Sequence, residues 1–140
     1  MCPIESGEIM SDPCLYILMR NDLDSLTPGK GMAQAAHAAC AFTIKMDDDQ
    51  YLDVRDLYDE WWIGRQGFGT TVVLAASLDQ IKVMVKQYAE QDKLIAGIVR
   101  DESYPVKDGA ETYHIDIDTC GYIFCDREKH LFMNELELYP

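Results

Sequence analysis

Residues 14–46 read CLYILMRNDLDSLTPGKGMAQAAHAACAFTIKM, and this stretch decides the fold. The apolar run from Cys14 to Met19 fits a strand that is buried on both faces of an α/β sheet. Thr27 suits the cap of a following helix, and Pro28 suits its first position, where a missing N–H costs nothing. The alanine-rich remainder favours a helix that lies close to a sheet. This unit of strand, turn and helix predicts the α/β class.

The rest of the chain continues the alternation of strand and helix. Hydrophobic periodicity and capping signals predict three further helices, over residues 49–64, from Ser77 onward and over residues 126–139. They also predict three further strands, over residues 70–76, 94–99 and 111–118. A loop that holds Pro105 and Gly109 is expected before the last of these strands. This order predicts helices on both faces of a small mixed sheet. We expect one domain over residues 13–140, preceded by a flexible leader over residues 1–12.

Composition restricts the classes of function. The chain has 140 residues with 25 acidic and 12 basic side chains, so its net charge is −13. A surface this acidic repels polyanions, which disfavours non-specific binding to nucleic acids and restricts any nucleotide contact to a local basic patch. There is no apolar run of about 18 residues and no basic targeting segment, so we expect no membrane span and a cytoplasmic location. The cysteines and histidines lack a C-x-x-C or zinc-type spacing, which predicts reduced thiols and no metal or other cofactor.

The start of the first expected helix carries the first candidate site residues. Lys30 lies in the first turn, where free N–H groups and the helix dipole attract anions. Lys30, Gln34 and His37 follow at i, i+4 and i+7, which places them on one stripe of the helix. A cation, an amide and an imidazole on this stripe would line one groove. A solvated lysine and a hydrogen-bonded histidine at a helix–sheet junction would explain the same spacing.

The ends of two strands add further charged residues. If the strands that lead into Arg20 and Arg100 are parallel, their carboxyl ends meet at the sheet edge where α/β proteins bind ligands. This edge would gather Lys30 and the substrate-binding candidates Arg20, Arg100 and Lys107 around the carboxylate of Asp101. Asp101 would stay ionised beside these cations and would either orient a water molecule or form a structural ion pair.

Two motifs resemble the type 2 peptidyl-tRNA hydrolases. These proteins combine an apolar strand ending in arginine, a short Asp-Leu turn and a helix of pattern G-K-x-x-A-Q-x-A-H-A, which the stretches YILMRNDL (residues 16–23) and GKGMAQAAHA (residues 29–38) match. In the loop after Arg100-Asp101, where the family carries glycine and a second threonine, Ser103 is the nearby hydroxyl and a further substrate-binding candidate. The resemblance extends over residues 14–118, because later family features have counterparts in the same order: Trp61 or Trp62, Arg65-Gln66-Gly67, Val72-Val73-Leu74, Arg100-Asp101 and Gly109-Ala110-Glu111-Thr112.

The resemblance implies a three-layer α/β/α sandwich with a four-stranded mixed β-sheet, and a homodimer. It implies an esterase that releases tRNA from peptidyl- or N-blocked aminoacyl-tRNA by metal-independent attack of water. The catalytic residues that it implies are Lys30, Asp101, Thr112 and His37, with Gln34 binding substrate. Lys30 would stabilise the negative charge that develops on the ester carbonyl, while Asp101 and Thr112 would position the water.

Three alternatives fit the same residues. The basic patch at the sheet edge would suit a small anionic nucleotide, which this fold would bind or cleave. The acidic exterior would suit a protein-interaction module that docks on a basic partner without catalysis. His114, Asp116 and Asp118 share one face of a strand, which would either bind a metal or remain an exposed polar face.

Overall fold

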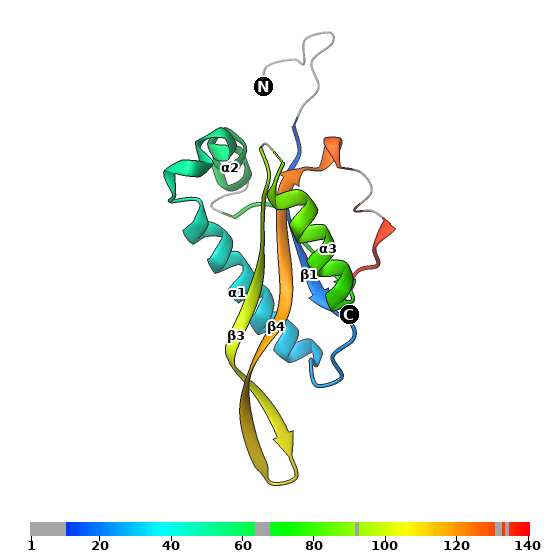
Figure 1. Cartoon of the computed structure of the whole chain (residues 1–140). Helices are drawn as coiled ribbons and strands as arrows, with labels where there is room; N and C mark the ends of the chain where they lie inside the picture. Colours follow the sequence, from blue (N-terminus) through cyan, green and yellow to red (C-terminus); the bar gives the residue numbers. More distant parts are fainter. Residues whose placement is uncertain (1–10, 64–67, 92, 131–132, 134) are drawn as a thin grey trace.

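The computed structural model describes residues 11–63, 68–91, 93–130, 133 and 135–140 (Figure 1). Its elements are β1 (Pro13–Arg20), α1 (Pro28–Lys45), the 3-10 helix η1 (Asp49–Val54), α2 (Arg55–Ile63), β2 (Thr71–Ala76), α3 (Leu78–Ala89), β3 (Ile95–Asp108), β4 (Glu111–Asp126) and the 3-10 helix η2 (Arg127–Lys129). Most of the expected leader and the matched stretch at residues 65–67 lie outside the described residues. Within the described ranges, no helix is both long and apolar enough to span a membrane.

The four strands form one mixed sheet in the order β2–β1–β4–β3. β1 pairs with β2 in parallel and with β4 in antiparallel orientation, and β3 pairs antiparallel to β4. β3 therefore runs in the same direction as β1, with β4 between them. The mixed four-stranded sheet that the family resemblance implies is confirmed.

Helices cover both faces of this sheet (Figure 1). Leu15 and Ile17 of β1 pack with Phe42 of α1 on one side, whereas Tyr16 and Leu18 join a second cluster on the side of α3. Successive side chains of a strand point to opposite faces, so a strand covered on both sides must be apolar at every position. This explains the apolar run in β1 and confirms the prediction of helices on both faces.

Local signals set the beginnings of the helices. Thr27 caps α1, with Pro28 at the start of the helix. Ser77 caps α3 and forms a capping box with Gln80. The helix predicted over residues 49–64 is divided, because the 3-10 helix η1 precedes the α-helical turns of α2.

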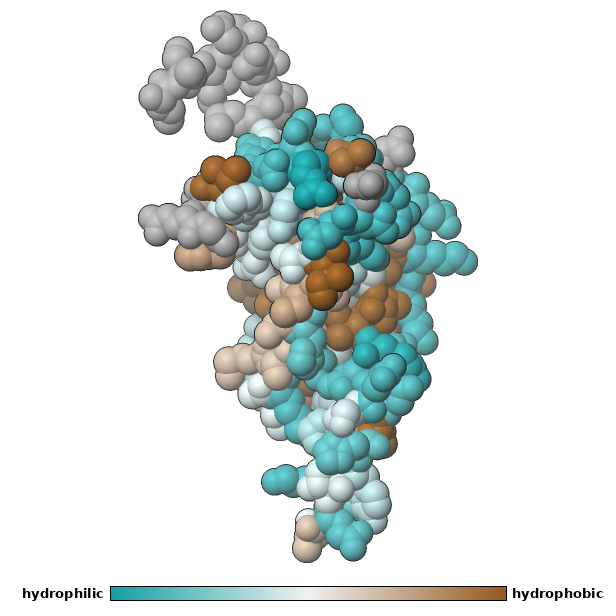
Figure 2. Space-filling view, turned by 90° about the vertical axis from the view of Figure 1, so that its left-hand side faces the viewer, coloured by the Kyte–Doolittle hydropathy of each residue, from teal (hydrophilic) through white to brown (hydrophobic). Residues whose placement is uncertain are grey.

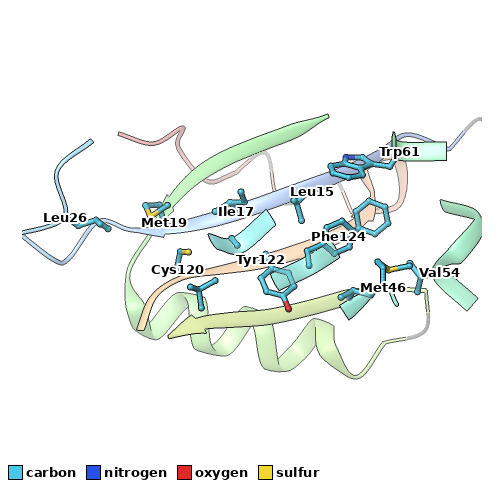
Figure 3. Close-up of a cluster of buried hydrophobic side chains, with 14 of the residues drawn as sticks. Leu15, Ile17, Met19, Leu26, Met46, Val54, Trp61, Cys120, Tyr122 and Phe124 are labelled. Atoms are coloured by element: carbon cyan, nitrogen blue, oxygen red, sulfur yellow. The ribbon is translucent and has the colours of Figure 1, made fainter. Parts of the chain in front are cut away.

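Phe42 joins α1 to α2 and to the sheet. Its ring is fully buried and packs edge-on against Tyr58 and Trp61 of α2, with ring centroids 5.6 and 5.5 Å apart. It also packs at tilted angles against Tyr122 and Phe124 of β4, at 6.3 and 4.7 Å. Figure 3 shows Trp61, Tyr122 and Phe124 in the buried cluster that these contacts form. The cluster fixes where α1 lies on the sheet.

β3 and β4 are longer than the sequence predicts. A loop is expected around Pro105, but β3 continues to Asp108, and the chain turns at Gly109 with a φ of 62°. Pro105 is tolerated because β3 is an edge strand, where a missing N–H need not remove a ladder hydrogen bond. β4 then extends from Glu111 to Asp126. The resulting hairpin projects beyond the rest of the sheet (Figure 1).

The predicted last helix over residues 126–139 is wrong. The described part of this segment contains 3-10 structure, including η2, and no α-helix. The N–H of Ala75 donates to the carbonyl of Glu137 at 2.8 Å, and the N–H of Tyr139 donates to the carbonyl of Val73 at 3.0 Å. The chain end thus pairs with the free edge of β2, whose backbone N–H and C=O groups have no other strand to bond. A helix could not pair with them, because its backbone groups are bonded to one another.

Replacing Phe42 with alanine is expected to lower the free energy of unfolding by about 3–5 kcal/mol, because it leaves a cavity between α1, α2 and β4. Urea denaturation measures this change. Ile44→Ala on the same helix is the matched control, since this side chain is 71% exposed, and we expect a change below about 0.5 kcal/mol. Equal losses in the two variants would contradict the packing described.

Candidate active site

A β-bulge in β4 turns Thr119 toward helix α1. The residues on either side of Thr119 pair with Val99 and Arg100, which are adjacent in β3, so Thr119 is an extra residue in its strand. A bulge re-aims side chains, and here both Thr119 and its neighbour Cys120 make contacts with Gln34 of α1. Thr119 is fully buried, and its hydroxyl donates to Gln34 Oε1 at 2.7 Å.

A second irregularity lies in β3 directly after Asp101. Asp101 pairs with Ile117 and Tyr104 pairs with Ile115, so two residues of β3 lie opposite one residue of β4. The backbone folds back on the carboxylate, and the N–H of Ser103 donates to Asp101 Oδ1 at 2.9 Å. This irregularity holds Asp101 on the side of α1.

Gln34 connects the two irregularities. Its Nε2 donates to Asp101 Oδ2 at 2.7 Å, while its Oε1 accepts the hydrogen bond from Thr119. Only 3% of Gln34 is exposed, and a buried amide requires partners for both its oxygen and its nitrogen. Thr119, Gln34 and Asp101 therefore form one fixed chain of hydrogen bonds, which we call the polar chain.

Lys30 contacts β3 four residues further along from Asp101. Its Nζ donates to the carbonyl oxygen of Pro105 at 2.7 Å and lies 4.9 Å from the centre of the Tyr104 ring. Tyr104 is fully buried, and its hydroxyl lies 3.1 Å from Ser25 Oγ in the loop before α1. These contacts hold the base of the hairpin against the beginning of α1.

Asp101 is held in its ionised form. Burial acts to raise the pKa of its carboxyl, but hydrogen bonds from Gln34 and the Ser103 N–H, with the nearby His37 and His114, outweigh burial and lower that pKa below its usual value. Asp101 is therefore an acceptor of hydrogen bonds at neutral pH.

The two arginines predicted to bind substrate are paired with carboxylates. Arg20 Nε lies 2.8 Å from Asp22 Oδ1, and Arg100 lies 2.7 Å from Asp116 and 3.1 Å from Asp118. These pairs correct the expectation of an open basic patch at the sheet edge. The alternative of a small anionic nucleotide loses two of the three cations on which it depends and keeps Lys30, which is bonded to a carbonyl oxygen.

Thr112 and Lys107 lie near the tip of the hairpin. They pair with each other across the ladder, and both are exposed. Thr112 lies five positions before Ile117, the partner of Asp101, which is about 17 Å along an extended strand. This placement corrects the expectation that Thr112 and Asp101 converge, because the bulge brings Thr119 to that position instead.

The other two predicted residues take different parts from those expected. His37 is exposed on α1, and the structure relates it to the polar chain through its electrostatic effect on Asp101. The sequence predicts that the Ser103 hydroxyl contacts substrate. In the structure it is the backbone N–H of Ser103 that makes a contact in the site, because it donates to Asp101.

Thr119 is the residue that sequence reasoning missed. The spacing after Gly109 points to Thr112 as the threonine that begins a strand. Thr119 directly precedes the apolar and buried run Cys120–Cys125, whereas polar side chains alternate with apolar ones before it. This change from an alternating to a continuous pattern is the signal that identifies where the strand enters the core.

The alternative of a metal site on β4 is not supported. Within the described part of the chain, no three His, Cys, Asp or Glu side chains are grouped so that they would hold a metal ion. Asp116 and Asp118 are both paired with Arg100. The interpretation as an exposed polar face therefore fits these residues better.

A cavity of about 330 Å³ lies at the opposite end of the sheet, where β3 begins and β4 ends. Asp53, Asp56 and Glu60 are among its lining residues. It shares no residue with the polar chain, so volume alone does not identify the site.

The sequence was compared with models of known protein families. The family model described as peptidyl-tRNA hydrolase PTH2 matches residues 14–122. The chain belongs to this family. The matched range contains Lys30, Gln34, Asp101 and Thr119, so the polar chain of this PTH2 protein lies wholly inside it. No curated protein matches the chain.

Thr119→Val should destabilise this PTH2 protein, because it leaves the buried Oε1 of Gln34 without a donor. We expect the free energy of unfolding to fall by about 1–3 kcal/mol in urea denaturation. Thr112→Val makes the same replacement of a hydroxyl by a methyl group in the exposed hairpin. It should change the free energy of unfolding by less than about 0.5 kcal/mol. The placement of Thr119 would be refuted if Thr112→Val were the more damaging change.

Gln34→Leu should raise the pKa of Asp101, because it removes a hydrogen bond that favours the ionised form. An NMR titration that follows the Asp101 carboxyl carbon measures the shift. Gln87→Leu on the exposed side of α3 is the matched control and should leave this pKa unchanged. An Asp101 pKa that is equal in wild type and Gln34→Leu would contradict the contact.

Proposed function

We propose that this protein hydrolyses the ester bond that joins a peptide or an N-blocked amino acid to the 3′ end of tRNA. Family membership supports the reaction class. The observation that carries the proposal is that two residues of the motif helix contact one stretch of β3. Lys30 contacts it at Pro105 and Gln34 contacts it at Asp101, so an amine and an ionised carboxylate are held against the same stretch of β3.

Lys30 suits the stabilisation of the oxyanion. When water attacks the ester carbonyl carbon, the carbonyl oxygen becomes negatively charged and the attacking water gives up a proton. The bond from this carbon to the ribose oxygen then breaks, and the ribose oxygen takes up a proton, so that a carboxylic acid and a free hydroxyl are formed. The Lys30 ammonium has three N–H donors, of which the Pro105 carbonyl uses one. The other donors are available for the developing charge without movement of the hairpin.

Asp101 suits the orientation of the attacking water. Each of its oxygens accepts one hydrogen bond within the protein, from Ser103 and from Gln34, and each has a further lone pair. Because its pKa is lowered, Asp101 is a weak base, and its part is to hold the water and to favour the partial positive charge that forms on it. Thr119 acts through Gln34 and is a positioning residue.

Three further predictions belong to this proposal. They are the homodimer, the cytoplasmic location and a metal-independent attack by water. The contacts described above neither require nor test them, and they stay predictions.

Release of tRNA from N-acetyl-aminoacyl-tRNA tests the proposed function. Lys30→Met removes an oxyanion donor and should lower kcat/KM by about 10²–10³-fold. Asp101→Asn keeps the shape of the side chain and should lower kcat/KM by about 10²–10⁴-fold. Lys86→Met on α3 is the matched control for the loss of one positive charge and should retain the wild-type rate.

Thermal denaturation of each variant keeps loss of folding separate from loss of chemistry. Folded Lys30→Met and Asp101→Asn variants that retain wild-type rates would exclude the assigned roles. A wild-type protein that releases no tRNA at micromolar concentration would exclude the function itself.

A further inference from the structure

The end of the chain contacts the loop that leads into α1. Its pairing with the free edge of β2 brings the side chain of Tyr139 to this loop. The Tyr139 hydroxyl donates to the carbonyl oxygen of Leu26 at 3.2 Å and lies 3.5 Å from that of Thr27. Tyr139 lies outside residues 14–122, which the family model matches, so family membership assigns it no role.

The Tyr139 hydroxyl supplies a donor where α1 begins. Leu26 is buried, and the backbone carbonyl of a buried residue requires a hydrogen-bond partner. The carbonyl of Thr27 accepts the N–H of Gly31 at 2.8 Å within the first turn of α1, whereas Leu26 precedes this turn. Tyr139 therefore ties the loop to the chain end directly before the helix.

Gly31 allows the ring of Tyr139 to lie against α1. A Cβ atom at this position would lie 2.8 Å from Tyr139 Cε2 and 2.9 Å from the hydroxyl oxygen, closer than non-bonded atoms approach. Glycine therefore leaves the room that the ring requires. Gly31 itself is buried, and Tyr139 packs against the core cluster that contains Phe42.

A second tyrosine holds the same loop from β3. Tyr104 is fully buried, its hydroxyl lies 3.1 Å from Ser25 Oγ, and its ring lies 4.9 Å from Lys30 Nζ. Burial, with a smaller contribution from the nearby Tyr104, raises the pKa of Tyr139 above its usual value, so the Tyr139 hydroxyl keeps its proton at neutral pH. Residues 25–27 are thus held by one phenol from β3 and one from the chain end.

The loop determines where Lys30 lies. The N–H of Lys30 donates to Thr27 Oγ1 at 3.4 Å, so the lysine backbone follows the loop residue that caps the helix. The Lys30 amine meets the hairpin at Pro105, and Figures 1 and 2 show this hairpin projecting from the body with a mostly hydrophilic to intermediate surface. A displacement of about 1 Å at the beginning of α1 would move the amine, and catalysis is sensitive to shifts of this size.

We propose that Tyr139 is a positioning residue for ester hydrolysis, which fixes the first turn of α1 and thereby the Lys30 amine. The inference rests on the function proposed above and adds the chain end to the parts on which the site depends. Tyr139 acts through Lys30. The effect falls on the chemical step, because the negative charge that Lys30 stabilises develops only as water attacks.

Tyr139→Phe removes the hydroxyl and keeps the ring. For hydrolysis of N-acetyl-aminoacyl-tRNA, we expect kcat to fall by about three- to tenfold, because one hydrogen bond that holds the loop is lost. KM should change by less than about twofold, because the lost interaction acts in the transition state. Tyr58→Phe is the matched control, since Tyr58 is also half-buried but packs in α2 against Phe42. Its kcat should stay within about twofold of wild type, and thermal denaturation checks that every variant is folded at the assay temperature.

The Lys30→Met background separates positioning from a merely structural role. If the hydroxyl acts through the amine, Tyr139→Phe should lower kcat in the wild type but change it by less than about twofold in Lys30→Met. Single-turnover measurements with protein in excess make the slow rates of these variants measurable. Loss by the same factor in both backgrounds would overturn the positioning role.

Gly31→Ala tests the same contact from the side of the helix. The added methyl group should displace the Tyr139 ring, although alanine favours the helix more than glycine does. We expect kcat to fall at least as far as in Tyr139→Phe, and the combined variant should lose less than about twofold more than Gly31→Ala alone. A folded Gly31→Ala variant with the wild-type kcat would overturn the inference.

Failure of this inference is distinguishable from failure of the proposed function. If wild type and Tyr139→Phe hydrolyse the ester at equal rates while folded Lys30→Met is impaired, the positioning role is excluded and the hydrolase function stands. A wild-type protein that hydrolyses no ester would exclude both.

Discussion

The side-chain amide of Gln34 lies between α1 and the sheet, where water does not reach it, and both of its ends must be paired within the protein. Thr119 supplies the donor for its oxygen, and Asp101 supplies the acceptor for its nitrogen. These two bonds fix the carboxylate relative to the motif helix. Lys30 lies one helical turn before Gln34, so its amine is fixed relative to the same carboxylate. The rest of the candidate site depends on this pairing.

The parts that the sequence predicts are those with local signals. Thr27 and Pro28 mark the beginning of α1, and the apolar run of β1 requires helices on both faces. Lys30 and Gln34 lie on one stripe because the period of a helix places them there. These features follow from neighbouring residues, so no knowledge of strand register is needed to predict them.

The features that the sequence does not predict depend on strand register, that is, on which residues of neighbouring strands face each other. One extra residue in a strand exchanges the side chains that face the core for those that face away. The change of pattern at Thr119 marks where β4 enters the core, but it does not reveal the bulge. The expectation of Thr112 assumes a regular strand after Gly109. The pairing of Arg100 with Asp116 and Asp118 likewise depends on which residues face each other across the hairpin. A net charge read from composition predicts repulsion, but it does not locate the cations that carboxylates neutralise.

A crystal structure with a non-hydrolysable analogue is the most direct test of the site. In 3′-amino-3′-deoxyadenosine that carries an N-acetyl amino acid, an amide replaces the ester. We predict that the amide oxygen lies within hydrogen-bonding distance of Lys30 Nζ and that the Asp101 carboxylate faces the same carbonyl carbon. An analogue bound in the cavity of about 330 Å³ at the other end of the sheet, with Lys30 and Asp101 untouched, would contradict this assignment.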